Sequence, residues 1–265
     1  MKVLVTNDDG VRARGLRALA TGLVEAGHDV SIVGPLTQHS GGGTGIGGEI
    51  MGALVRTTRI DDEQLPGVPI LGIDGPPAAA VLAVVHGLVS EQLGGPPDFV
   101  VSGINSGHNL GRLALHSGTL GAASTAALYG LPAIAISCSP DPTGQYEAAA
   151  DFCARLLATY SGDWPVGEIL NINFPDAPLD LEEVVVTTLS RGRRGEVAME
   201  LLADGFRMNL LRDFSETRRT GQAGESDAEA IGRGCVSVTR LLGGLFVRPE
   251  IRGNAALDRV CRTPV

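Results

Sequence analysis

Short apolar runs alternate with segments of helical periodicity along the first 160 residues. Residues 3–6 and 28–33 are apolar and rich in β-branched side chains, which is typical of buried strands. Between them, residues 14–26 place leucine and alanine at helical spacing, and Gly27 follows where a helix C-cap belongs. Strand, helix and strand in this order predict a right-handed βαβ unit at the start of the chain.

The same alternation continues to about residue 160. We expect strands at 55–60, 68–73, 99–102 and 132–137, and helices at 76–88, 117–129 and 147–159. Prolines 76 and 77 suit the first turn of their helix, where a missing N–H costs little. The pattern predicts a Rossmann-like α/β fold, with a doubly wound, mostly parallel sheet and helices on both faces. It leaves the order of the strands open.

After about residue 165 the pattern becomes less regular. Strands are expected at 168–174, 184–189 and 235–239, separated by a polar stretch at 191–224, and the tail from Gly243 carries no clear signal. We therefore place a soft boundary here. Residues 1–165 form the predicted catalytic core, and residues 166–265 complete the same domain and supply subunit contacts.

Composition narrows the class of function. The net charge of −9 argues against an electrostatic binder of nucleic acid, which would carry a basic stripe. The four cysteines are widely spaced without a CxxC pair, which favours reduced thiols over disulfides or zinc. No apolar run reaches membrane-spanning length, and the chain begins with a strand rather than a signal-peptide pattern. We expect a cytoplasmic protein without membrane association.

The first strand ends at two adjacent carboxylates, Asp8 and Asp9. The carboxyl ends of parallel strands form the edge where open α/β sheets bind ligands. Two like charges at that edge need a compensating cation or a raised pKa. The acidic pair therefore predicts part of a metal site.

Two polar, glycine-bearing loops leave the same predicted edge and carry Ser40 and Asn105. Together with Asp8 and Asp9 they form an all-oxygen donor set, which suits magnesium, manganese or calcium rather than zinc or copper. Residues 117–119 (Ser-Gly-Thr) begin a helix, so their N–H groups and the helix dipole would suit a phosphate group.

A series of short motifs also follows the order found in one known family. These are Asn7-Asp-Asp-Gly10, Ser40-Gly41, Ser102-Gly-Ile-Asn105, Gly107-His-Asn-Leu-Gly111, Ser117-Gly-Thr119 and Gly121-Ala-Ala123. In this order the chain resembles the SurE family of survival-protein nucleotidases. The resemblance is dense over residues 1–140 and thins afterwards to 171–175, 226–227 and 234–239.

The resemblance implies a divalent-metal-dependent phosphomonoesterase that hydrolyses nucleoside monophosphates to nucleoside and phosphate. It implies one divalent ion per subunit, magnesium or manganese (calcium in some crystals), held by Asp8, Asp9, Ser40 and Asn105. It also implies a homodimer or homotetramer built through a C-terminal hairpin. The expected contacts with the nucleotide or other small phosphate ester are Asn7, Gly41, Ser106, Asn109, Ser117, Gly118 and Thr119.

Four places depart from the family pattern: Arg14, Leu36-Thr37, Ala78–Ala80 and His116. They leave the metal set intact but put the nucleotide preference in doubt. A specialised phosphatase for an unusual nucleotide or another phosphate ester, or a non-catalytic nucleotide-binding relative, therefore remains an alternative. A phosphoacceptor receiver domain would be about half as long, and a dinucleotide oxidoreductase would carry GxGxxG after the first strand.

The catalytic roles stay open at this level. Either Asp8 or Asp9 could act as general base or nucleophile as well as ligand. His39, His108 and His116 lie in or beside the site loops, and we expect His108 or His116 to protonate the leaving group. Cys138 follows a predicted strand without a paired base and is expected to be inert.

Overall fold

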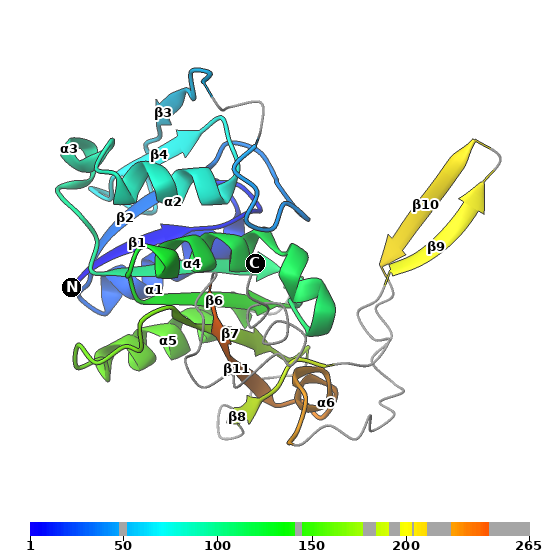
Figure 1. The fold of residues 1–265 in the computed structure, drawn as a ribbon. Coiled ribbons are helices and arrows are strands. Elements are labelled where there is room, and N and C mark those ends of the chain that lie inside the picture. The colour runs from blue at the N-terminus through cyan, green and yellow to red at the C-terminus, as the bar shows by residue number, and fades with distance from the viewer. Residues whose placement is uncertain are drawn as a thin grey trace, which may run out of the picture.

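The computed structural model describes residues 1–47, 52–140, 145–176, 184–190, 197–202, 204–210 and 224–243. Its first part alternates between strand and helix, and its last part consists mainly of strands (Figure 1). The tail after Gly243, with Cys261, and most of the predicted polar stretch lie outside the described residues. In chain order the elements are β1 (Lys2–Thr6), α1 (Arg14–Glu25), β2 (Asp29–Pro35), β3 (Thr57–Arg59), β4 (Ile70–Ile73), α2 (Pro77–Val85), α3 (Ser90–Leu93), β5 (Phe99–Ser106), the 3₁₀ helix η2 (Gly111–His116), α4 (Gly118–Leu128), β6 (Ala133–Cys138), α5 (Gln145–Ala158), β7 (Glu168–Phe174), β8 (Val184–Thr187), β9 (Val197–Leu202), β10 (Gly205–Leu210), α6 (Asp227–Gly232) and β11 (Val236–Leu242).

Nine strands form one sheet in the order β3-β4-β2-β1-β5-β6-β7-β11-β8. The strands from β4 to β7 run parallel, whereas β3 is antiparallel to β4 and β11 is antiparallel to β7. The order reverses at β1, because the chain first builds β2 and β4 on one side and then β5 to β7 on the other. This reversal is the topological switch point of the sheet. The predicted fold class is confirmed.

Helices cover both faces of the sheet (Figure 1), which explains why Val3, Leu4 and Val5 in the middle of β1 are all apolar. Val3 and Val5 join the buried cluster that contains α1 and α5, while Leu4 joins the cluster that contains α2 and α4. A central parallel strand is covered on both sides, so it lacks the alternation of a half-exposed strand. Among the described residues, no helix has the length and apolar character needed to cross a membrane.

Several element boundaries differ from the predicted ones. The helix expected at 76–88 ends at Val85, a left-handed Gly87 follows, and a separate short α3 begins at Ser90. The strand expected at 55–60 is only the exposed edge strand β3. Most consequentially, β5 continues past a register shift after Ser102 and ends at Ser106, so Asn105 lies in a strand rather than a free loop.

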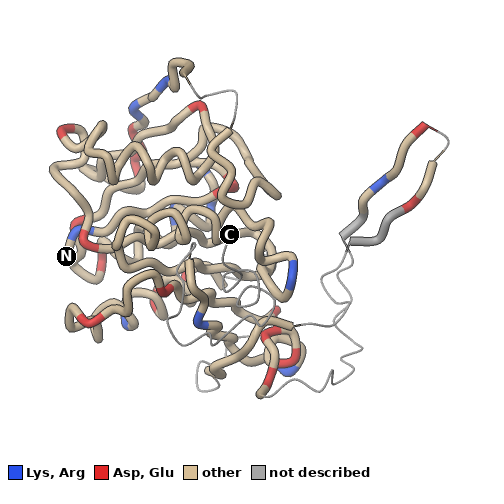
Figure 2. Tube along the Cα trace, viewed as in Figure 1, with Lys and Arg blue, Asp and Glu red and all other residues tan. Residues whose placement is uncertain are grey.

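The part after residue 165 adds β7, β11 and β8 to the same sheet and places β9 and β10 in a separate antiparallel hairpin. Figure 1 shows the hairpin standing away from the nine-stranded sheet. Leu201, Phe206 and Met208 of the hairpin are exposed. In Figure 2 the acidic and basic residues are scattered over the described trace.

Candidate active site at the switch point of the sheet

Asp8 and Asp9 follow β1 directly, at the point where the strand order reverses. Asp8 is almost completely buried, with 3% of its surface exposed, and Asp9 is half-buried. Burial raises the pKa of the Asp8 carboxyl, and the neighbouring charge of Asp9 raises it further. Burial also raises the pKa of Asp9. The structure thus contains the electrostatic conflict that the sequence indicated, and a bound cation would relieve it.

The start of α4 is built against Asp8. The Thr119 hydroxyl donates a hydrogen bond of 2.5 Å to Asp8 Oδ1, and a hydrogen bond from the Gly118 backbone also stabilises the carboxylate. A Cβ added at Gly118 would lie 2.7 Å from Asp8 Cβ, a distance that real side chains do not tolerate. Ser117 caps the helix by accepting from Leu120 N. These residues, predicted to bind phosphate, are therefore also the residues that orient Asp8.

The loop after β2 brings Ser40 to the acidic pair. The His39 backbone N–H donates to the Asp8 carbonyl oxygen at 2.7 Å. The side-chain amide of Gln38 donates both to Asp9 Oδ1, at 3.3 Å, and to the Ser40 hydroxyl, at 2.9 Å. Because one nitrogen reaches both oxygens, these two predicted metal ligands lie on the same side of the site, next to the Gln38 amide. Gly41 follows with φ +80°, a left-handed conformation that glycine adopts without strain.

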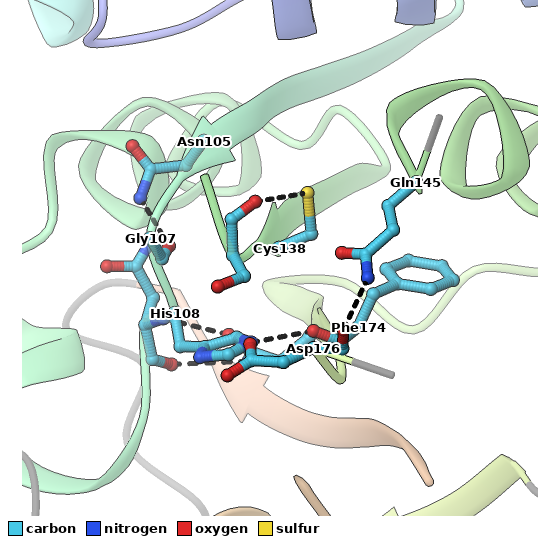
Figure 3. A network of polar contacts seen from close by, with 10 residues as sticks. Asn105, Gly107, His108, Cys138, Gln145, Phe174 and Asp176 are labelled. Atoms are coloured by element: carbon cyan, nitrogen blue, oxygen red, sulfur yellow. Dashed lines mark hydrogen bonds and ion pairs between the residues drawn. The ribbon is translucent and has the colours of Figure 1, made fainter. Parts of the chain in front are cut away.

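The end of β5 contributes the third side of the site. The Ser106 backbone N–H donates to Asp9 Oδ2 at 2.8 Å. The Asn105 side-chain nitrogen donates to the Gly107 carbonyl at 2.6 Å. Figure 3 shows that this contact turns the Asn105 amide oxygen away from Gly107. The amide is thereby fixed with its acceptor atom available to a ligand on the opposite side.

The two histidines expected to act as acids lie in different environments. His108 Nε2 lies 2.6 Å from the Phe174 carbonyl oxygen and 3.6 Å from a carboxylate oxygen of Asp176 (Figure 3). A carbonyl only accepts hydrogen bonds, so Nε2 carries the ring proton and donates a hydrogen bond to the Phe174 carbonyl in β7. Burial lowers the pKa of His108, which favours the neutral ring. The His116 side chain is exposed, and its backbone carbonyl accepts from Gly43 N at 3.0 Å.

Asn7 and Asn109, both expected to touch substrate, take part in contacts within the protein. Asn7 is completely buried and closes the turn after β1 by donating to the Gly10 carbonyl at 3.0 Å. The backbone N–H of Asn109 donates to Asn173, and its side chain donates to Ser137, each at 2.8 Å. Both residues shape the loops that carry the ligands.

Four residues with structural links to the site were absent from the predicted set. They are Gln38, Asn171, Asn173 and Asp227. Asn171 and Asn173 of β7 donate to the Asn109 carbonyl, at 2.8 and 3.3 Å. Their signal in the sequence is two amides at alternate positions of an otherwise apolar strand, where a polar side chain needs a partner. Gln38 stands next to the predicted loop ligands, and Asp227 belongs to the 226–227 motif of the family resemblance, to which no role at the site was assigned.

The donor set fits a hard divalent cation. Two carboxylates and two neutral oxygens come from the ends of β1, β2 and β5, and oxygen donors of this kind suit magnesium or manganese. Over the described ranges, no group of three or more His, Cys, Asp or Glu side chains is placed to hold a metal ion. Such a site therefore depends on its neutral oxygens, Ser40 and Asn105, and on the contacts that hold them.

Fold and site together define a doubly wound α/β protein with an acidic, oxygen-lined centre at its topological switch point. The profile of the family "Survival protein SurE" matches residues 3–196, and the chain belongs to this family. Its relatives include the "5'-nucleotidase SurE" of Gloeobacter violaceus, which is 34% identical over 95% of this chain and 93% of the relative. The "5'-nucleotidase SurE" of Geotalea uraniireducens is 36% identical over 91% of this chain and 92% of the relative.

A solved structure agrees with the fold. The SurE protein from Aquifex aeolicus superposes with a TM-score of 0.75 at 26% sequence identity. The alignment covers 97% of this chain and all of that protein. The similarity therefore extends beyond the residues that the family profile matches.

Proposed function

We propose that this protein is a divalent-metal-dependent phosphomonoesterase that hydrolyses nucleoside monophosphates to nucleoside and phosphate. One observation carries the proposal: Gln38 reaches both Asp9 and Ser40, so carboxylate and hydroxyl oxygens from two strand ends converge beside the start of α4. The relatives' name, 5'-nucleotidase, supports the class of substrate.

Asp8, Asp9, Ser40 and Asn105 would hold one magnesium or manganese ion per subunit. Such an ion supplies positive charge to the phosphoryl oxygens and lowers the pKa of a bound water. Phosphoryl transfer asks little covalent work of the protein, so positioning and charge neutralisation provide most of the rate.

The remaining tasks fall to the chain's own side chains. Thr119 fixes the orientation of Asp8, and the positive end of the α4 dipole lies on the same side. The segments that would face or frame the phosphate contain Ser117, Gly118, Thr119, Gly41, Ser106 and Asn109. His116 is the better placed of the two candidate acids, because its ring is exposed, whereas His108 Nε2 donates its hydrogen bond to the Phe174 carbonyl. Asp8 or Asp9 would accept the proton of the attacking water.

A specialised phosphatase for an unusual nucleotide is the second candidate, and Leu36 favours it. A Cβ added at Gly72 would lie 2.3 Å from Leu36 Cδ2, so the leucine packs directly over the β4 backbone. Leu36 nonetheless keeps 40% of its surface exposed at the same edge of the sheet as the site. An apolar side chain thus stands at one of the places that depart from the family pattern, which would change the contacts available to the nucleoside.

A phosphate-release panel tests both candidates. Nucleoside 5'- and 3'-monophosphates, sugar phosphates and polyphosphate are each assayed with Mg²⁺, Mn²⁺ or EDTA. We expect metal-dependent release from nucleoside monophosphates and none with EDTA. Full activity in a metal-free preparation would contradict the metal site. Tight nucleotide binding without turnover under every metal would indicate a non-catalytic relative.

We further propose a homodimer or homotetramer in the cytoplasm. The exposed Leu201, Phe206 and Met208 of the β9–β10 hairpin support subunit contacts, and the buried thiol of Cys153 suits a reducing compartment. Light scattering of the wild type and Phe206→Glu tests the assembly. A smaller particle for the variant is expected, and an unchanged mass would contradict this role of the hairpin.

A further inference from the structure

Asp227 is a completely buried carboxylate at the start of α6, outside the residues that the family profile matches. Its Oδ2 accepts from Gly111 N at 2.7 Å. Its Oδ1 accepts from Ser190 N at 2.9 Å and from Ala228 N at 2.8 Å. Burying a carboxylate is costly unless hydrogen bonds replace its water, and here three backbone donors do so. The contact with Gly111 joins residues 116 positions apart.

The segment that Asp227 holds leads straight back to the metal centre. Ser106 is bonded to Asp9, Gly107 N donates to the Cys138 carbonyl at 2.7 Å, and His108 is bonded to Phe174. Asn109 is bonded to β6 and β7, and Gly111 is bonded to Asp227. The chain from Asn105 to Gly111 is thus fastened at successive residues, with Asn105 at one end and Asp227 at the other. Figure 3 shows the part of this network around Asn105, Gly107 and His108.

We propose that Asp227 is a positioning residue for the active site: by holding Gly111 it fixes the segment that carries Asn105, and so sets the affinity of the site for a divalent cation. The inference rests on the proposed function, because it assigns the centre to a metal. It adds a residue from the far end of the chain to the parts that the metal centre needs. Groups that orient ligands commonly change metal affinity by about 10- to 100-fold when they are lost.

Asp227→Asn separates this role from a general structural one. An asparagine has the same shape but only one acceptor oxygen. If that oxygen keeps the two bonds to Ser190 and Ala228, the NH₂ group must face the Gly111 N–H, donor against donor. The variant therefore keeps α6 attached and releases the site segment.

The neighbouring Ser226→Ala is the matched control. Ser226 and Glu229 form a capping box at the start of α6 through hydrogen bonds to each other. Its loss should lower the melting temperature by roughly 2–4 °C and leave metal binding unchanged.

The experiment measures Mn²⁺ affinity by electron paramagnetic resonance and hydrogen exchange of the Gly111 amide in wild type and both variants. We expect Asp227→Asn to weaken Mn²⁺ binding by about tenfold and to speed exchange at Gly111, with Ser226→Ala changing neither. Wild-type Mn²⁺ affinity in Asp227→Asn would overturn the proposal. So would an equal loss of affinity in Ser226→Ala.

A second measurement needs no variant, so it serves if Asp227→Asn does not fold. Because coupling between sites is reciprocal, saturating Mn²⁺ should slow exchange at Gly111 in the wild type. Unchanged exchange would overturn the positioning role. Absence of both Mn²⁺ binding and phosphate release in the wild type would instead reject the proposed function.

Discussion

The parts of the chain before and after residue 165 contribute different kinds of groups to one site. The first part supplies the oxygens that we propose as metal ligands: Asp8, Asp9, Ser40 and Asn105. The second supplies buried side chains that bond to the protein itself, namely Asn171, Asn173 and Asp227. The proposed ligands stand at strand ends, where the local sequence is enough to recognise them. The residues that hold these ligands in place resemble ordinary polar residues inside a strand or a short helix. Changes in the first group should abolish the reaction, and changes in the second group should shift affinity or stability.

Asp9→Asn should have the largest effect. It removes the charge that Gln38 and Ser106 hold in place, and with it several kcal/mol of electrostatic stabilisation, so phosphate release should fall by roughly 1000-fold. Phosphate release at saturating Mn²⁺ measures the loss. The exposed Asp163→Asn is the control and should retain full activity. An active Asp9→Asn enzyme would contradict the assignment of Asp9 as a metal ligand.

His116→Gln should reduce kcat for nucleoside monophosphates by about 100-fold, because an alkoxide leaving group requires a proton. The same variant should hydrolyse p-nitrophenyl phosphate almost normally, since that leaving group departs without protonation. His86→Gln, which alters an exposed histidine bonded to Tyr129, is the control and should change neither rate. Equal losses on both substrates would assign His116 to binding instead.

Thr119→Val sharpens the comparison within the first part of the chain. The valine keeps the shape of the side chain but removes the hydroxyl that donates to Asp8, so Mn²⁺ should bind about tenfold more weakly. Thr125→Val is the matched control, because its hydroxyl donates to the Gly121 carbonyl within the same helix. Calorimetric Mn²⁺ titrations of both variants make the test, and an identical result for the two would contradict an orienting role.

His108 should produce the smallest effect, visible mainly as pH dependence. Its pKa in the folded protein is lowered by burial, so the unfolded chain takes up the proton first as the pH falls. Stability that depends on neutral His108 is therefore lost on acidification from about pH 6.5 downward. The advantage of wild type over His108→Asn in free energy of unfolding should shrink between pH 7.5 and pH 5. Urea unfolding at each pH measures it, and a constant difference would mean that the imidazole titrates alike in both states.

Much of the fold follows from the sequence because its signals are local. The run from Val3 to Val5 is apolar because β1 is buried on both faces of the sheet. The apolar residues of α1 recur at helical spacing because the helix packs on one face of the sheet. The predicted strand at 168–174 agrees with β7 at both ends. The strand order and the continuation of β5 to Ser106 could not be predicted in this way, because they depend on which strands lie side by side.

The sequence by itself determined the fold class, the family and the position of two adjacent acids at the end of a central strand. Only the tertiary structure decided that Thr119 holds Asp8, that Gln38 bridges Asp9 and Ser40, and that Asp227 fastens Gly111. The physical reason is distance along the chain. Periodicity and propensity report the surroundings of nearby residues, whereas the partner of a buried carboxylate 116 residues away is fixed only when the whole sheet has assembled.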